Sequence, residues 1–245
     1  MTIPSEDFDE LPWDSQLFGF PVARLRAAAI TSDRFMLAMA ALRAGGIRLA
    51  YGLIPWKDGN GRSLFESIGA HMVDRKTRFR KHLASKVSRF PDGVELWPSQ
   101  ECPTELEALA LASGHQSRFR IDPRVPSHVF QELYLAWIRR SVLGEIAQAV
   151  LISREAGKIA GMVTLSSGEG VAEIGLLAVD RVCRGKGVGK RLMAASETWA
   201  VECGAASLEV VTQGANAEAC ALYAASGLDI VDQQAVYHVW MEERR

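Results

Sequence analysis

The fold of this chain is decided by the stretch EIGLLAVDRVCRGKGVGK, residues 173–190. Its first part, Ile174 to Val179, is a short apolar run of the kind that forms a strand buried on both faces. Glycines then occupy alternate positions between Arg184 and Lys190, which predicts a tight turn whose backbone a ligand can approach closely. The amphipathic pattern that follows predicts a helix, and the free N–H groups of its first turn favour an anion.

Three phosphate-binding patterns compete for this turn. The Walker pattern requires Ser or Thr after a Gly-Lys pair, and the dinucleotide pattern requires Gly-x-Gly-x-x-Gly, so neither one matches. The third pattern, Gln/Arg-x-x-Gly-x-Gly/Ala after a strand, is matched by Arg184, Gly187 and Gly189. The segment therefore resembles the acetyl-CoA pyrophosphate loop of the GCN5-related N-acetyltransferases (GNAT), with a purely structural glycine turn as the alternative.

A second segment resembles the same family. Asn216 to Tyr223, followed by Ser226-Gly227-Leu228, is similar to the family's Asn-x-x-Ala-x-x-x-Tyr-x-x-x-Gly-Phe segment, with Leu in place of Phe. The order of predicted helices and strands from Thr104 onward is also that of the family. This resemblance implies an α/β (α+β) GNAT fold, with a central mixed and mostly antiparallel sheet that splays open at the acetyl-CoA site.

The first part of the chain follows a different pattern. Apolar runs and capping residues alternate there in a β-α-β-α-β order, which predicts a small α/β domain. The proline- and glycine-containing segment 90–99 predicts a linker, so we place the domains at 1–98 and 99–245. Thr104 and Glu107 are expected to form a capping box. Strands are predicted over 22–25, 47–54, 72–83, 149–153, 158–165, 171–179, 207–211 and 237–241, helices over 31–44, 62–68, 104–113, 129–143, 190–200 and 216–225, and loops over 11–21 and 117–123.

Composition excludes several classes of protein. The formal net charge of −1 argues against nucleic-acid binding, and no apolar run has the length of a membrane span, about 20 residues. Met1 to Glu10 has no signal-peptide pattern, and the four cysteines show no C-x-x-C pair, which suits reduced thiols in the cytoplasm. We expect a cytoplasmic enzyme with a small-molecule substrate and no metal; a homodimer is left open.

The resemblance assigns the cofactor site. It implies that backbone groups near Leu177 and Val179 hold the pantetheine arm of acetyl-CoA, while the amides of the glycine turn hold its pyrophosphate. Asn216 would bond the pantetheine, or would simply cap its helix. The implied acetyl-CoA residues are Leu177, Ala178, Val179, Arg184, Gly185, Lys186, Gly187, Val188, Gly189, Lys190, Asn216 and Tyr223.

Acetyl transfer needs an acid and a base. Tyr223 is the candidate acid, because a phenol of pKa ~10 can protonate a departing thiolate whose thiol has a pKa of ~8.5. Glu173 is a candidate base because it lies on the strand that leads to the acetyl site, although a solvent-facing strand residue is the alternative. Asp74 resembles a position where sugar-specific relatives carry Glu, and His115 is a third candidate.

Further segments resemble the members of the family that acetylate nucleotide sugars. They include 13–19, 117–119, 133–137 and 211–216, and they imply an acceptor such as dTDP-4-amino-4,6-dideoxygalactose. Ser117 and Arg118 are the implied acceptor-binding residues, while Arg120 is as readily a partner in a loop salt bridge. Another small amine, an amino acid or a peptide is an alternative acceptor. A CoA-binding sensor without turnover is the alternative from a different class.

A basic run attracts attention in the first half. In a strand, Lys76, Arg78 and Arg80 share one face. Such a face either binds a phosphate-bearing ligand or keeps a sheet edge solvated, and the second interpretation is favoured here. The complete run is Arg75, Lys76, Arg78, Arg80, Lys81 and Lys86.

Overall fold

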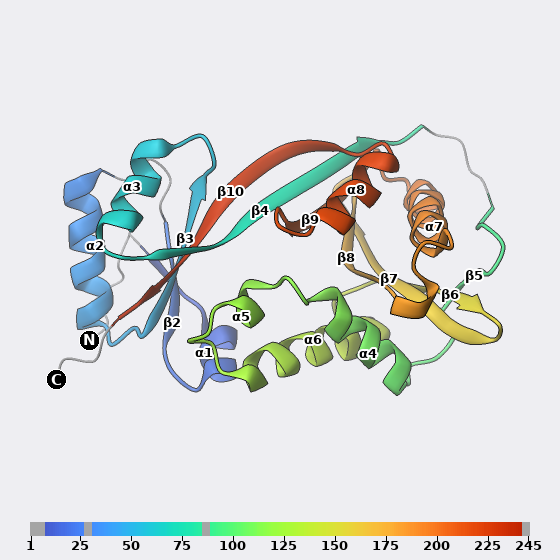
Figure 1. Ribbon diagram of the computed structural model, residues 1–245, viewed down its shortest axis with the longest axis horizontal. Helices are drawn as coiled ribbons and strands as arrows, with labels where there is room; N and C mark the ends of the chain where they lie inside the picture. The colour runs from blue at the N-terminus through green and yellow to red at the C-terminus, as the bar shows by residue number, and fades with distance from the viewer. Residues whose placement is uncertain (1–7, 27–30, 85–88, 242–245) are drawn as a thin grey trace.

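The computed structural model describes residues 8–26, 31–84 and 89–241, and the strands within them form one mixed sheet (Figure 1). Its order is β1-β2-β3-β10-β4-β9-β8-β7-β6-β5. Only the β2–β3 and β8–β9 pairs are parallel, and the other pairs are antiparallel. The predicted mixed, mostly antiparallel sheet is therefore confirmed.

The first half of the chain builds one end of the sheet and the helices that cover it. The predicted loop over 11–21 is wrong, because Pro12 starts a helix there and Gly19, at a φ of 73°, ends it. Phe18 on this helix is buried. The elements are β1 (Phe8–Glu10), α1 (Pro12–Phe18), β2 (Val22–Leu25), α2 (Ser32–Ala44), β3 (Leu49–Pro55), α3 (Gly59–Ser67) and β4 (His71–His82).

The second half contains the other end of the sheet. Pro103 occupies the N-cap of α4, so the predicted Thr104 capping box is wrong, and a short helix replaces part of the predicted loop over 117–123. The elements are β5 (Val94–Leu96), α4 (Thr104–Ser113), α5 (Arg118–Ile121), α6 (Ser127–Val142), β6 (Ala149–Glu155), β7 (Lys158–Gly168), β8 (Val171–Val179), a 3₁₀ turn (Arg181–Cys183), α7 (Val188–Glu202), β9 (Ser207–Gln213), α8 (Ala217–Ala225) and β10 (Asp229–Trp240).

The long strand β10 joins the two halves. It pairs with β3 along one edge and with β4 along the other, and β4 pairs in turn with β9 (Figure 1). The hydrogen-bonded sheet thus continues across the expected domain boundary at residue 98, and the division into two domains stays a prediction.

The interpretation of the basic run as a sheet edge is wrong, because β4 lies inside the sheet, between β10 and β9. Lys86 of that run and the first seven residues lie outside the described residues.

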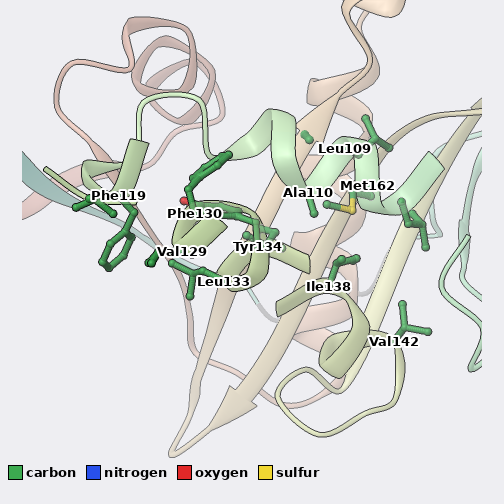
Figure 2. Packing of buried hydrophobic residues seen from close by; sticks show 14 of the residues in the cluster. Leu109, Ala110, Phe119, Val129, Phe130, Leu133, Tyr134, Ile138, Val142 and Met162 are labelled. Atoms are coloured by element: carbon green, nitrogen blue, oxygen red, sulfur yellow. The ribbon is translucent and has the colours of Figure 1, made fainter. Parts of the chain in front are cut away.

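Helices cover both faces of the sheet. α4 and α6 pack on one face of the second half, where Leu109, Leu133 and Ile138 belong to one buried cluster with Met162 of β7 (Figure 2). α7 packs on the other face through Leu192 and Trp199 among others. α2 and α3 form a third cluster with the opposite end of the sheet. In that cluster Gly52 has to be glycine, because a Cβ there would overlap the Phe65 ring.

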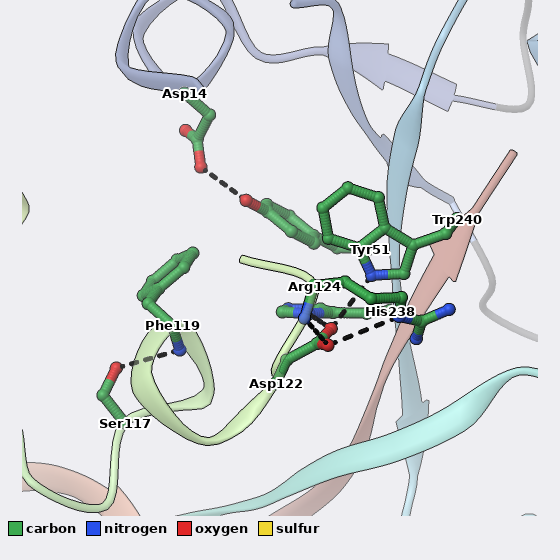
Figure 3. A network of polar contacts seen from close by, with 8 residues as sticks. All are labelled: Asp14, Tyr51, Ser117, Phe119, Asp122, Arg124, His238 and Trp240. Carbon is green, nitrogen blue, oxygen red and sulfur yellow. Dashed lines mark hydrogen bonds and ion pairs between the residues drawn. The ribbon is translucent and has the colours of Figure 1, made fainter. Parts of the chain in front are cut away.

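One buried carboxylate ties α5 to β10. Asp122 accepts hydrogen bonds from His238 Nδ1 at 2.8 Å and from Trp240 Nε1 at 2.9 Å (Figure 3). Burial alone would raise the pKa of Asp122, but these bonds and one from the backbone N–H of Arg124 hold it well below the usual range. The carboxylate is therefore charged and fully paired, which fixes the segment that follows α4 against the last strand.

We expect Asp122→Ala to lower the free energy of unfolding by about 2–4 kcal/mol, because the indole and imidazole donors would remain buried without an acceptor. Urea titration of both proteins measures the difference. Asp122→Asn, which keeps the size and one acceptor oxygen, should lose less. A loss below about 0.5 kcal/mol in the alanine variant would contradict a stabilising role for this network.

Candidate active site

The site begins where two parallel strands separate. β8 and β9 pair only from Val171 opposite Ser207 to Ile174 opposite Val210, after which β9 continues against β4 alone. A bulge in the β7–β8 pairing lies at the same point. The remainder of β8, up to Val179, therefore has a free backbone edge on the side of β9, so the sheet splays after Ile174.

Gly175 and Thr164 build the bulge. The Thr164 hydroxyl accepts a hydrogen bond from the backbone N–H of Leu176 at 2.9 Å. A Cβ at Gly175 would lie 2.8 Å from that hydroxyl oxygen, so a larger residue would displace it. Before the bulge Ile174 packs on the α7 side, and after it Leu176 packs on the α4–α6 side. The bulge thus moves the buried side chains of β8 from one face of the sheet to the other.

The glycine turn lies directly beyond the free edge. Gly185 and Gly187 have φ values of 73° and 79°, in the left-handed region, and Gly187 is the N-cap of α7. The turn borders a cavity of about 580 Å³, here called the loop cavity. Its lining includes Ser113, His115, Leu177, Ala178, Val179, Arg184, Gly185, Gly187, Val188, Gly189, Lys190, Asn216, Ala219 and Leu222. The first residues of α7, Val188, Gly189 and Lys190, thus border a space of ligand size.

Two arginines hold the turn in shape. Arg184 forms an ion pair with Glu218 of α8 at 2.9 Å, and its Nε lies 3.4 Å from the carbonyl oxygen of Val179. Arg191 donates to the carbonyl oxygen of Lys186 at 3.2 Å and pairs with Glu155. The Lys186 side chain itself is exposed and is not among the residues that line the loop cavity.

A second cavity, also of about 580 Å³, adjoins the first and is called the acceptor cavity after the role proposed for it below. The two share Ser113, Leu177, Asn216 and Ala219, so they lie side by side at the splayed strand. The acceptor cavity lies between the two halves of the chain. Its lining includes Trp13, Asp14, Asp74, Lys76, Arg78, Ser117, Arg118, Tyr134, Trp137, Glu173, Glu209, Gln213 and Tyr223.

Asn216 and Tyr223 lie at the start and in the middle of α8. Asn216 Oδ1 accepts a hydrogen bond from Ala219 N at 3.2 Å, so it is the N-cap of α8. Tyr223 is 5% exposed, packs against Phe79 and lines the acceptor cavity. Burial raises the pKa of its hydroxyl, which is therefore protonated at neutral pH.

The three candidate bases lie in different places. Asp74 and Glu173 both line the acceptor cavity, whereas His115 lines the loop cavity and its Nδ1 lies 3.1 Å from the carbonyl oxygen of Ala112. Burial raises the pKa of Asp74 to about 6, although the Arg118 guanidinium opposes the rise. Glu173 stands exposed beside Glu209 of β9 in the parallel register.

The Ser117 hydroxyl oxygen accepts a hydrogen bond from Phe119 N at 3.3 Å (Figure 3). The Arg118 guanidinium stacks over the rings of Phe119 at 4.3 Å and Tyr51 at 5.1 Å. Its buried Nε has no hydrogen-bond partner among the described residues. Arg120 instead lies over Phe130, 5.4 Å from the ring centroid, and is not among the residues that line the acceptor cavity.

Sequence reasoning missed part of the cavity. The sequence indicates Trp13, Tyr134 and Trp137 only as members of resembling segments, and it does not single out Glu209. A charged residue inside the apolar strand SLEVVTQ, 207–213, is the available signal for Glu209. For Lys76 and Arg78 the sequence predicts a solvated sheet edge, whereas both residues line the cavity.

The family follows from these features and from similarity to known proteins. Residues 104–228 match the family described as "Acetyltransferase (GNAT) family", and the chain therefore belongs to the GNAT acetyltransferases. Over 224 residues it is 31% identical to the dTDP-fucosamine acetyltransferase of Escherichia coli O6:H1. The aligned segment covers 91% of this chain and 93% of that relative. Members of this family use acetyl-CoA as their co-substrate.

Solved structures support the fold. The GCN5-related N-acetyltransferase from Sphaerobacter thermophilus aligns with a TM-score of 0.63 and 14% identity, over 95% of this chain and 76% of that chain. A functionally unknown conserved protein from Staphylococcus epidermidis aligns with a TM-score of 0.62 and 11% identity, over 96% of this chain and 92% of that chain.

Among the described helices, none is long and apolar enough to cross a membrane. No group of three or more metal-ligating side chains occurs within residues 8–26, 31–84 and 89–241.

We expect Asp74→Asn to stabilise the protein at pH 8 by roughly 1 kcal/mol. The folded-state pKa is raised above its ordinary value of 3.8, so the charged form destabilises the fold as the pH rises through about 6. The gain should disappear below about pH 4, where both states bind the proton. Thermal unfolding from pH 4 to 8 measures it, with the exposed Asp92→Asn as control. An equal gain at every pH would show that charge is not the cause.

We expect Gly187→Ala to weaken acetyl-CoA binding about tenfold, because a Cβ at a φ of 79° costs roughly 1–2 kcal/mol and relief of that strain would move the loop amides. Gly144→Ala is a matched control, since Gly144 has a φ of 78° with nothing within 4 Å of its Cβ position and does not line the loop cavity. Calorimetric titration with acetyl-CoA separates the two variants. Equal loss of affinity in both would argue against a phosphate-binding role for this turn.

Proposed function

We propose that the protein transfers the acetyl group of acetyl-CoA to the amine of a nucleotide-linked amino-deoxysugar of the dTDP-4-amino-4,6-dideoxygalactose type. The observation that carries this proposal is the 31% identity to a dTDP-fucosamine acetyltransferase across 91% of the chain. That similarity extends over both halves of the chain, and both halves line the acceptor cavity. Acceptor specificity is therefore proposed to come from the two halves together.

Acetyl-CoA is proposed to lie along the free edge of β8. Its pyrophosphate would rest on the amides from Arg184 to Lys190, and its pantetheine arm would pair with Leu177, Ala178 and Val179 as an added strand. The shared lining of the two cavities supports this placement, because the thioester would then reach the boundary between them. Asn216 is the N-cap of α8 and would contribute chiefly by orienting that helix.

The reaction forms a C–N bond and breaks a C–S bond. The neutral amine attacks the thioester carbonyl, and the tetrahedral oxyanion collapses with loss of the CoA thiolate. A backbone N–H on the free edge of β8 is proposed to stabilise the oxyanion. Tyr223 would give its proton to the thiolate, which its neutral hydroxyl at the cavity wall allows.

Asp74 is the base that the site favours. A carboxyl group with a pKa of about 6 is ionised at neutral pH and still accepts a proton more readily than an ordinary aspartate. It also faces the cavity from the half of the chain opposite the glycine turn. Glu173 is the second candidate, and it stands exposed at the cavity wall. His115 lies in the loop cavity, which makes it the weakest of the three.

Ser117 and Arg118 are proposed to contact the acceptor from α5. Arg118 lines the cavity with a partly exposed guanidinium that stacks on two rings, so its terminal nitrogens can donate to an acceptor oxygen. Acetylation of another small amine is the alternative function. It is favoured only by the family membership itself, which fixes no acceptor.

The test is release of free thiol from acetyl-CoA with dTDP-4-amino-4,6-dideoxygalactose as acceptor. The wild type should turn over this sugar at a kcat/KM at least a hundredfold above that for glucosamine, lysine or spermidine. Tyr223→Phe should lower kcat by roughly 10²-fold or more, because general acid catalysis contributes typically 10²–10⁴. Acetyl-CoA affinity should change little in this variant, because phenylalanine keeps the ring that packs against Phe79 and removes only the hydroxyl.

Two results would count against the proposal. Turnover of simple amines without turnover of the sugar nucleotide would discard the acceptor class and leave the family. Binding of acetyl-CoA without thiol release to any acceptor would favour a CoA-binding sensor instead.

A further inference from the structure

A cationic face of β4 forms one wall of the acceptor cavity. Lys76 and Arg78 line the cavity, and Arg80 follows on the same face but lies outside the lining. In the sheet register Lys76 stands opposite Gln213 of β9, and Arg78 stands opposite Val211. The proposed functions of the base, the acid and the glycine turn leave these charges without a role.

A buried carboxylate holds two of the three cations in place. Glu209 on β9 has a side chain that is 5% exposed, and it accepts from Arg78 Nη1 at 2.8 Å and from Arg80 Nε at 2.6 Å. One negative charge is thus shared by two guanidinium groups, which leaves a positive excess on this face. Because both bonds are charge-assisted, the Arg78 side chain is pre-organised toward the cavity rather than free in solvent.

Lys76 has no such anchor. It forms no hydrogen bond or ion pair with any of the described residues, although it is partly buried. Burial lowers the pKa of Lys76, and the nearby charges of Arg78 and Arg118 lower it further, while Asp232 and Asp74 oppose the fall. Cations from β4 and α5 therefore repel one another across the same cavity, an arrangement that an anionic ligand would stabilise.

The cavity also carries carboxylates, Asp14, Asp74, Glu173 and Glu209, but they come from different elements. Asp14 accepts a hydrogen bond from the Tyr51 hydroxyl at 3.1 Å, and Glu209 is shared by Arg78 and Arg80. Among the described residues, neither Asp74 nor Glu173 forms an ion pair with Lys76 or Arg78. The cationic part of the cavity thus lies on β4, with the Asp74 carboxylate next to it on the same strand face.

We propose that Lys76 and Arg78 bind the diphosphate of a nucleotide-linked acceptor, with Arg118 completing the site from α5. This inference rests on the proposed function. The spacing agrees with the chemistry, because Asp74 and Lys76 are two residues apart, about 6.7 Å along a strand. A pyranose ring carries its C1 diphosphate and its C4 amine at opposite ends, so one group would reach the cations while the other reaches the base.

The experiment measures binding of dTDP, which contains the diphosphate but no amine, by calorimetry. Lys76→Gln and Arg78→Gln should each raise the Kd for dTDP at least tenfold. Arg80→Gln is the matched control, because it removes the same kind of bond to Glu209 without touching the cavity lining, and it should change the Kd less than threefold. The two arginine variants should have similar unfolding temperatures, and acetyl-CoA should bind all three variants as it binds the wild type.

Several outcomes would overturn the inference. The first is that the wild type does not bind dTDP, and the second is that Lys76→Gln and Arg78→Gln leave the Kd for dTDP unchanged. The third is that Arg80→Gln raises this Kd as much as they do, and the fourth is that the variants lose affinity for acetyl-CoA in parallel. Thiol release by the wild type with the sugar nucleotide tests the proposed function separately. Turnover of the sugar together with unaltered dTDP binding in the variants would reject this site and keep the function. If Lys76→Gln and Arg78→Gln weaken dTDP binding but the wild type does not turn over the sugar, the site is kept and the proposed function is rejected.

Discussion

The early end of the β8–β9 pairing is the constraint on which the site depends. Parallel hydrogen bonds stop at Ile174, where the Thr164 hydroxyl takes the N–H of Leu176 and Gly175 leaves room for it. A backbone edge left free inside a sheet is normally costly, because its polar groups need partners. Here that edge borders both cavities, so a ligand that pairs with it supplies the missing partners. The glycine turn and α8 line the cavity beside this edge.

The local part of this arrangement could be predicted from the sequence. The apolar run before the turn, the alternating glycines and the Asn216–Tyr223 segment each have a short-range cause, since capping, φ and periodicity are properties of neighbouring residues. The structure accordingly contains β8, α7 and α8 close to their predicted bounds. The family that these segments resembled is the family to which the chain belongs.

The parts that depend on distant pairing could not be predicted in the same way. Nothing local shows that β4 lies between β9 and β10, so a basic face that forms a cavity wall was interpreted as a solvated edge. The aromatic segment around Trp13 was expected to be a loop because aromatic residues are ambiguous, whereas Pro12 and Gly19 were the true helix signals. The role of Asp122 was equally hidden, since its partners His238 and Trp240 lie at the far end of the sequence.

The position of β10 has a consequence for how the protein is made. This strand follows all the other described strands in the sequence, yet it lies in the interior of the sheet between β3 and β4. During synthesis on the ribosome, β3 and β4 therefore cannot pair with β10 until most of the chain has emerged. Contacts of such long sequence separation form slowly, and two strand edges remain open to wrong pairing in the meantime. Completion of the sheet, and of the cavity wall on β4, belongs to the last stage of folding.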